Sequence, residues 1–210
     1  LGKSMPPDFG EWHTWVWPLL DTLAMSVAAT VVCVLLSLPL AICASPTTAP
    51  NRSCYHAARM IFNCLRSIPE LIMGIFLVAA YGFGALPGVL ALALHSTGMV
   101  AKFYAEAIEH VDQQPIEAAQ ACGANHLQIV THGVLPQVFP QLVDITLYRW
   151  EYHFRASTVV GIVGAGGIGF HLISALRLVR YDQACAILLI IFVMVMAIDG
   201  LSATLRRRFK

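Results

Sequence analysis

The stretch LLDTLAMSVAATVVCVLLSLPLAICA, residues 19–44, holds 26 residues and a single charged side chain, Asp21. An α-helix needs about 20 consecutive apolar residues to cross the ~30 Å hydrocarbon layer of a bilayer. This stretch is therefore long enough to span a membrane. The turn-forming residues Pro46, Pro50 and Asn51 end it. The segment predicts an all-α membrane protein.

The composition of the 210-residue chain agrees with that prediction. Hydrophobic residues make up 58% of the chain and charged residues 12%, and the mean hydropathy is +0.70. A soluble domain carries roughly 25% charged residues, so half that share is too little to cover the surface of a soluble globule. Lipid is therefore expected as part of the solvent. A net charge of +1 gives no support to nucleic-acid binding.

Four further spans complete a polytopic bundle of five. Residues 71–101 carry no charge and are too long for one comfortable span. The turn signal YGFGALPG, residues 81–88, divides them, so a single helix is expected from Ala57 to Tyr81. The four predicted spans cover about residues 57–81, 86–108, 137–163 and 184–204.

The distribution of Lys and Arg predicts the orientation of the spans. The C-terminal RRRFK, residues 206–210, places that end in the cytoplasm, because positive charge accumulates on the cytoplasmic side. Counting back, the loop that contains Arg52 and the polar stretch 109–134 are also cytoplasmic. Residues 1–18 and the turn 82–87 are expected outside.

Neither the cysteines nor the histidines form a pattern typical of metal binding. The six cysteines include no C-x-x-C pair, and the eight histidines are scattered. Cysteine in apolar helices behaves as a small buried hydrophobic residue. No metal site is predicted.

The run GIVGAGGIG, residues 161–169, contains the G-x-G-x-x-G spacing of a dinucleotide-binding turn. That motif has meaning only inside a soluble strand–turn–helix unit, so a nucleotide-binding oxidoreductase is kept as an alternative. Inside a membrane, glycines let a helix break where it lines a path. We expect such a break, serving as a gate, while a simple outer loop is the competing interpretation. The predicted gate residues are Gly164, Gly166, Gly167 and Gly169.

The cytoplasmic stretch QQPIEAAQACGANHLQIVTHGVLPQVFP, residues 113–140, predicts a short helix with a smooth face. Pro115 suits the first helical turn, and Glu117 there complements the helix dipole. Small alanines follow, and Gly123 offers a left-handed stop. A second, amphipathic helix is expected after it. By itself this pattern also fits an ordinary loop helix of a membrane protein.

This stretch resembles the E-A-A…G…L-P loop of importer permeases of the ATP-binding-cassette class. The matching residues are Glu117, Ala118, Ala119, Gly123, Leu135 and Pro136. Gly133 departs from the Ile that the family often has there. The segments RSIPE (66–70) and VGAGGIG (163–169) are similar to methionine-type and phosphonate-type permeases. The branch similar to phosphonate permeases is indicated by residues 89–109, by GVLPQ (133–137) and by LYRWE (147–151).

The resemblance implies the type I importer permease fold, with a coupling helix that docks on a separate ATPase. Its docking residues would be Glu117, Ala118, Ala119, Gly123 and Ala124. It implies a bacterial inner-membrane complex of two permease copies, two ATPase subunits that bind ATP and Mg, and an extracytoplasmic binding protein. The chain itself has no Walker A loop and no expected catalysis. Phosphonate permeases usually have a further span before this region, so we expect Leu1 to follow a missing segment.

The resemblance favours phosphonate or a related small phosphorus oxyanion as the cargo, with methionine as the alternative. A stand-alone channel or secondary transporter would not need the loop at 109–134. The charges Arg149, Glu151 and Arg155 lie within a predicted span, where charges normally face a path or a partner. Glu151 and Arg155 are four residues apart and suited to pair. Arg149 remains for the anion, and Glu70 is a candidate counter-ion to Arg66 or to an arginine of the fourth span.

Overall fold

The structure is a computed structural model that describes residues 6–209. Within those residues all regular secondary structure is helical, as the sequence predicts. The elements in chain order are α1 (Trp12–Ala44), α2 (Arg52–Ser67), α3 (Glu70–Tyr81), α4 (Ala85–Glu109), α5 (Gln113–Ala121), α6 (His126–Gln128), the π-helical turn η1 (Ile129–Val134), α7 (Leu135–Val160), the π-helical turn η2 (Gly161–Ala165), α8 (Gly167–Arg177) and α9 (Tyr181–Phe209).

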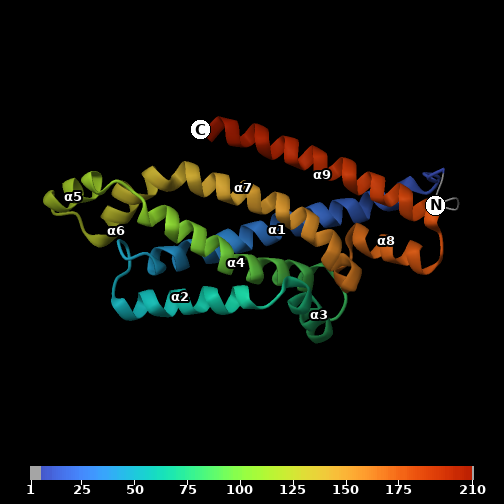
Figure 1. Cartoon of the computed structure of the whole chain (residues 1–210), viewed down its shortest axis with the longest axis horizontal. Coiled ribbons are helices and arrows are strands. Elements are labelled where there is room, and N and C mark those ends of the chain that lie inside the picture. Colours follow the sequence, from blue (N-terminus) through green and yellow to red (C-terminus); the bar gives the residue numbers. More distant parts are fainter. Residues whose placement is uncertain (1–5, 210) are drawn as a thin grey trace.

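The long helices run along one axis of an elongated bundle (Figure 1). In the described part, α1, α4 and α9 are each long and apolar enough to cross a membrane. The bent pairs α2 with α3 and α7 with α8 bring the number to five if each pair forms one span. The loop between α1 and α2, the end of α4, and α5 all lie toward the same end of the bundle (Figure 1).

Small side chains let α1 and α4 pack closely at the centre of the bundle. Ala29 and Ala41 of α1 and Ala91 and Ala93 of α4 are fully buried. Close approach through small residues is how helices associate when lipid removes the hydrophobic driving force between them. The outer surface instead carries large apolar side chains, such as Phe192 on α9 with 63% exposure. That distribution suits a surface covered by lipid.

The predicted single helix from Ala57 to Tyr81 is wrong. Two helices, α2 and α3, cover this region and meet at an angle of 85°. Ile68 is extended, with φ −93° and ψ 121°, because the ring of Pro69 disfavours helical geometry in the preceding residue. The helix also begins earlier than predicted, at Arg52, where the side chain of Asn51 accepts a hydrogen bond from the amide of Cys54 at 2.7 Å.

A second break follows α7, where the glycine run predicts one. Gly164 has φ 109°, and Gly166 and Gly167 also have positive φ, a region that side chains with a Cβ rarely occupy. The chain turns by 60° there and continues as α8. The glycine run is therefore a helix break within a long apolar segment, not the turn of a soluble nucleotide-binding unit.

Candidate functional site

The short helix α5 ends as the sequence predicts. Gly123 has φ 77°, so its backbone is left-handed. Its amide donates to the carbonyl of Gln120 at 2.9 Å, and the amide of Ala124 donates to the carbonyl of Ala119 at 3.1 Å. These bonds satisfy carbonyl groups that a helix terminus would otherwise leave free. The result is a compact helix with a sharp exit.

The start of α5 is fastened to α7 by one side chain. Gln137 of α7 accepts a hydrogen bond from the amide of Asp112 at 3.0 Å and donates one to the carbonyl of Asp112 at 3.2 Å. It also donates to the carbonyl of Gly133 at 2.6 Å. Ile116, the buried residue of α5, packs in the same core cluster as Val134. Contacts at its N-terminal cap and at its buried residue therefore join α5 to α7 and to η1.

Arg59, midway along α2, contacts the ends of two other helices near α5. Arg59 of α2 lies 2.6 Å from Glu109, the last residue of α4. The same guanidinium donates to the carbonyl of Ala44, the last residue of α1, at 3.3 Å. Arg59 therefore links the ends of α1 and α4 to the middle of α2, where the chain enters the loop that carries α5. The arrangement connects this loop to several long helices.

The predicted docking residues lie on the outer side of this loop. Glu117 and Ala118 are exposed, and Ala119 and Ala124 are half-buried. A shallow hollow of about 520 Å³ adjoins them. It is lined by Ala119, Cys122, Gly123, Ala124, Gln128 and His132. A short helix with small side chains beside a hollow offers a shape into which another protein surface can fit.

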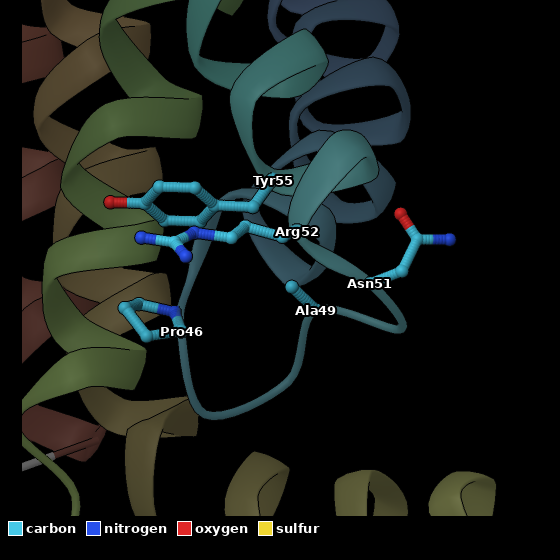
Figure 2. A pocket seen from close by; sticks show the side chains of 5 residues that line it. All are labelled: Pro46, Ala49, Asn51, Arg52 and Tyr55. Atoms are coloured by element: carbon cyan, nitrogen blue, oxygen red, sulfur yellow. The ribbon is translucent and has the colours of Figure 1, made fainter.

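A second hollow, of about 370 Å³, lies at the start of α2 (Figure 2). It is lined by Pro46, Ala49, Asn51, Arg52 and Tyr55. The guanidinium of Arg59 lies 4.7 Å from the centre of the Tyr55 ring, a cation–π contact. Positive charge is thus concentrated at this end of α2.

The guanidinium of Arg149, in the interior of the bundle, is incompletely paired. Arg149 of α7 is 5% exposed, and its Nη1 donates to the sulfur of Met99 at 3.3 Å. Its Nε and Nη2 have no hydrogen-bond partner among the described residues. The guanidinium lies 4.3 Å from the centre of the Tyr152 ring, and the Tyr152 hydroxyl donates to Glu70 at 2.8 Å. The structure thus brings the predicted pathway residues Arg149 and Glu70 together through a tyrosine.

The predicted pairing of Glu151 with Arg155 is wrong. Glu151 accepts a hydrogen bond from Arg206 of α9, and Arg155 lies 3.1 Å from Asp199 of α9. The two side chains are one turn apart on α7, and both reach α9, which offers each an oppositely charged partner. These two residues therefore hold α7 against α9 and do not surround Arg149.

The glycine break is stabilised by contacts from three directions. The amide of Gly84 donates to the carbonyl of Gly164 at 3.2 Å. The Thr22 hydroxyl of α1 accepts the amide of Ile168 at 2.9 Å, which satisfies an amide in the first turn of α8. A Cβ on Gly169 would meet the carbonyl of Thr158. An apolar hollow of about 340 Å³ adjoins the break, lined by Phe83, Gly84, Gly164, Gly166 and Phe170.

Sequence reasoning missed His153, a fully buried residue of α7. Its Nδ1 shares a hydrogen bond with Thr30 of α1 at 2.7 Å, and its Nε2 shares one with Ser96 of α4 at 2.6 Å. The residue therefore joins the three central helices. The signal available in the sequence was a pair of hydroxyl residues, Thr30 and Ser96, inside two apolar stretches, since such groups need a hydrogen-bond partner when buried. No group of three His, Cys, Asp or Glu residues in the described part of the chain is placed to hold a metal ion.

Solved structures share this arrangement of helices. The structure superposes on a chain of an inward-facing methionine ABC transporter with a TM-score of 0.82, covering 96% of this chain and 99% of that one. The sequence identity is 22%, so this likeness concerns the fold. The fold is that of type I ABC importer permeases.

Curated relatives are similar over almost the whole chain. A phosphite transport system permease protein of Stutzerimonas stutzeri is 58% identical over 209 residues, which cover 100% of this chain and 76% of the relative. A phosphate-import permease protein of Mycolicibacterium smegmatis is 41% identical over 98% of this chain, and the match spans 39% of that protein. Both relatives are named as transport permeases and not as enzymes. Residues 34–210 match the family described as binding-protein-dependent transport system inner membrane component, and the chain belongs to this family of multi-pass bacterial inner-membrane permeases of ABC importers.

Proposed function

We propose that this chain moves a small phosphorus oxyanion, such as phosphite, phosphate or a phosphonate, into the bacterial cytoplasm by alternating access. The observation that carries the proposal is α5, an exposed small-residue helix fastened to α7 through Gln137 and to α4 through its loop. Such a helix can receive a push from a partner and pass it to the spans. The names of the two relatives support the choice of cargo.

The energy comes from a separate ATPase that binds ATP and Mg and docks on α5. The contact residues are Glu117, Ala118, Ala119, Gly123 and Ala124. Two ATPase subunits serve two copies of this chain, and an extracytoplasmic binding protein delivers the anion from the other side. In this arrangement the C-terminus is cytoplasmic, and the lipid bilayer surrounds both copies. Nucleic acid has no part in it.

Arg149 is the residue proposed to attract the cargo inside the membrane. A guanidinium matches the oxygens of a phosphorus oxyanion with two parallel hydrogen bonds, and Nε and Nη2 are the free pair of donors here. Because Arg149 is 5% exposed, the anion reaches it only after α3 and α7 separate. The Tyr152–Glu70 hydrogen bond is the contact that this movement would break. Glu151 and Arg155 serve the pathway indirectly, by fixing α7 to α9.

The glycine break is proposed as the gate, where Gly164, Gly166, Gly167 and Gly169 meet the same run of the second copy. Ala165 is 1% exposed. A cysteine at position 165 is therefore expected to react slowly with a thiol reagent in the described arrangement and faster in another nucleotide state. If the cysteine reacts at the same rate in every nucleotide state, the gate is refuted and the glycine run serves only as a structural turn.

Docking on α5 is tested by adding bulk. Ala118→Trp should abolish uptake and substrate-stimulated ATP hydrolysis by the reconstituted complex, because the side chain would separate α5 from the ATPase. The matched control is Ala203→Trp, at an exposed alanine of α9, and it should retain uptake. Normal import by Ala118→Trp would refute the role of α5.

The choice of cargo is tested by competition. In proteoliposomes with the cognate binding protein enclosed on the extracytoplasmic side, unlabelled phosphate and methylphosphonate should reduce uptake of labelled phosphite. Methionine at the same concentration should not. Uptake of methionine in place of phosphite would contradict the proposal and favour the methionine-type alternative.

A further inference from the structure

Helix α2 carries a continuous polar face, and the contacts described above involve only one of its side chains, Arg59. The residues on it recur at intervals of four and three, the period that places side chains on one side of a helix. They are Arg52, His56, Arg59, Asn63 and Arg66. The face extends from Arg52 to Arg66, a rise of about 21 Å along the helix, and Arg52–Ser67 contains no acidic residue. An adjacent side of α2, roughly 100° around the helix from this face, packs into the bundle through the buried residues Ala58 and Phe62.

The far end of this face lies at the depth of the membrane centre. A Cβ on Gly98 of α4 would stand 3.0 Å from the amide of Arg66, so these two residues are level. Gly98 precedes Glu109, the cytoplasmic end of α4, by 11 residues, or about 16 Å of helix. The middle of the face is level with Glu109, because Arg59 forms an ion pair with that residue. The polar face therefore runs from the membrane surface to its middle.

Arg66 is exposed at that depth, and no hydrogen bond or ion pair to it occurs among the described residues. Glu70, four residues later, is bonded to Tyr152 instead. A guanidinium facing lipid at the membrane centre is costly, and a side chain about 16 Å from the surface is too deep to extend into the headgroups. The face is therefore expected to meet water or another protein surface, and not lipid, inside the membrane.

The break between α2 and α3 supports the same conclusion. Non-helical backbone at membrane depth is tolerated where it is packed in protein or lines a watery cavity. The carbonyl of Ile68 is paired with the ring of His95 at 2.9 Å, while Ser67, Ile68 and Pro69 are all exposed. Arg66 thus lies at a helix break that is open on one side.

We infer that the polar face of α2 lines the cytoplasmic half of the pathway and that Arg66 is a binding site for the oxyanion within it. This rests on the proposed function. Arg66 holds the anion at mid-depth. Arg59, whose charge Glu109 partly neutralises, comes next toward the cytoplasm. Arg52, at the hollow of Figure 2, follows and attracts the anion to the cytoplasmic end. Several weak cationic positions in sequence favour entry without preventing release.

The first test measures whether the face meets water. Asn63→Cys and Ile61→Cys are made separately in a cysteine-free chain within the whole complex. Both positions are exposed on α2, but they point to nearly opposite sides of the helix. The probe is methanethiosulfonate ethylsulfonate, a membrane-impermeant anion. We expect position 63 to react at least about tenfold faster than position 61, because a thiolate forms only in water, and phosphite to slow the reaction at 63.

The second test measures the contribution of Arg66 to transport. Arg66→Gln should lower uptake at limiting phosphite about tenfold, the effect of losing one charge-assisted contact. Arg66→Lys should retain part of the uptake, since it keeps the charge but loses the planar fork. Arg177→Gln, at an exposed arginine of α8 without an ion pair among the described contacts, is the matched control and should leave uptake unchanged.

The outcomes separate this inference from the proposed function. Equal reactivity at positions 61 and 63 would show that the face does not meet water and would overturn the inference, even if phosphite is transported. Fast reaction at 63 with no protection by phosphite and normal uptake by Arg66→Gln would overturn the binding site. Failure of the unmodified complex to import any phosphorus oxyanion would instead refute the proposed function.

Discussion

The left-handed exit of α5 makes Gly123 the position where a small substitution should have a large effect on coupling. Gly123 has φ 77°, and a Cβ added there would have no atom within 4 Å. A substitution is therefore opposed by backbone strain and not by a clash within this chain. Gly123→Val is the test substitution, and Gly123→Asn is its control, because Asn adopts the left-handed region several-fold more readily than other side chains.

The expected magnitude follows from comparing the strain with the bonds that maintain the exit. A left-handed conformation costs a residue with a Cβ roughly 1–2 kcal/mol, and a β-branched residue more. Two hydrogen bonds maintain the turn, at 2.9 and 3.1 Å, and each contributes about 1 kcal/mol. For valine the strain equals or exceeds the two bonds, so the exit unwinds in a large fraction of molecules. For asparagine the strain is smaller than the stabilisation by the two hydrogen bonds, so the left-handed exit is retained.

The assay is the ratio of phosphite imported to ATP hydrolysed by the complex in proteoliposomes. Gly123→Val should lower this ratio about tenfold, the factor that corresponds to ~1.4 kcal/mol, while Gly123→Asn stays within about twofold of the unmodified complex. Equal loss for both variants would indicate a clash with the ATPase surface. Full coupling with valine would refute the reasoning from backbone strain.

Three further predictions concern the packing of the spans. Gly169→Ala places a Cβ against the Thr158 carbonyl and should lower the thermal unfolding midpoint in detergent by about 5 °C. Gly200→Ala is the control and should leave the midpoint unchanged, because a Cβ there has no atom within 4 Å. Equal midpoints for the two variants would contradict this prediction. Arg155→Asp and Asp199→Arg should each reduce assembled protein, and the double exchange should restore it; no recovery would exclude the pair. His153→Leu removes hydrogen bonds of 2.7 and 2.6 Å and should lower the free energy of unfolding by about 1–3 kcal/mol. An unchanged unfolding midpoint would contradict this prediction.

The apolar stretches and glycine turns predicted most of the framework. Residues 19–44, with Asp21 as their single charge, lie within α1, which begins earlier at Trp12 and ends at the predicted Ala44, and the turn at 81–88 separates α3 from α4. The break before α3 was missed because residues 57–81 have the length of one membrane span and were taken as a single helix, although the break itself lies in the polar segment RSIPE, residues 66–70. Pro69 was the local signal, since it restricts the conformation of Ile68 whatever the hydropathy of the surroundings.

The ion pairs and the buried histidine depended on information that a linear reading lacks. Glu151 and Arg155 were within reach of each other along one helix, yet their partners lie on α9, 55 and 44 residues away. His153 meets Thr30 across 123 residues. Such contacts are decided by which faces of α7 turn toward α1, α4 and α9, and hydrophobic periodicity alone leaves those rotations open.

The most direct test of the account is the accumulation of labelled phosphite in proteoliposomes that contain this permease, its ATPase and its binding protein. Energy delivered through α5 predicts accumulation above the external concentration only when ATP and Mg reach the ATPase, and no accumulation when Ala118→Trp replaces the unmodified chain. Accumulation to the same level without ATP, or by the Ala118→Trp complex, would contradict an ATP-driven importer coupled at this helix.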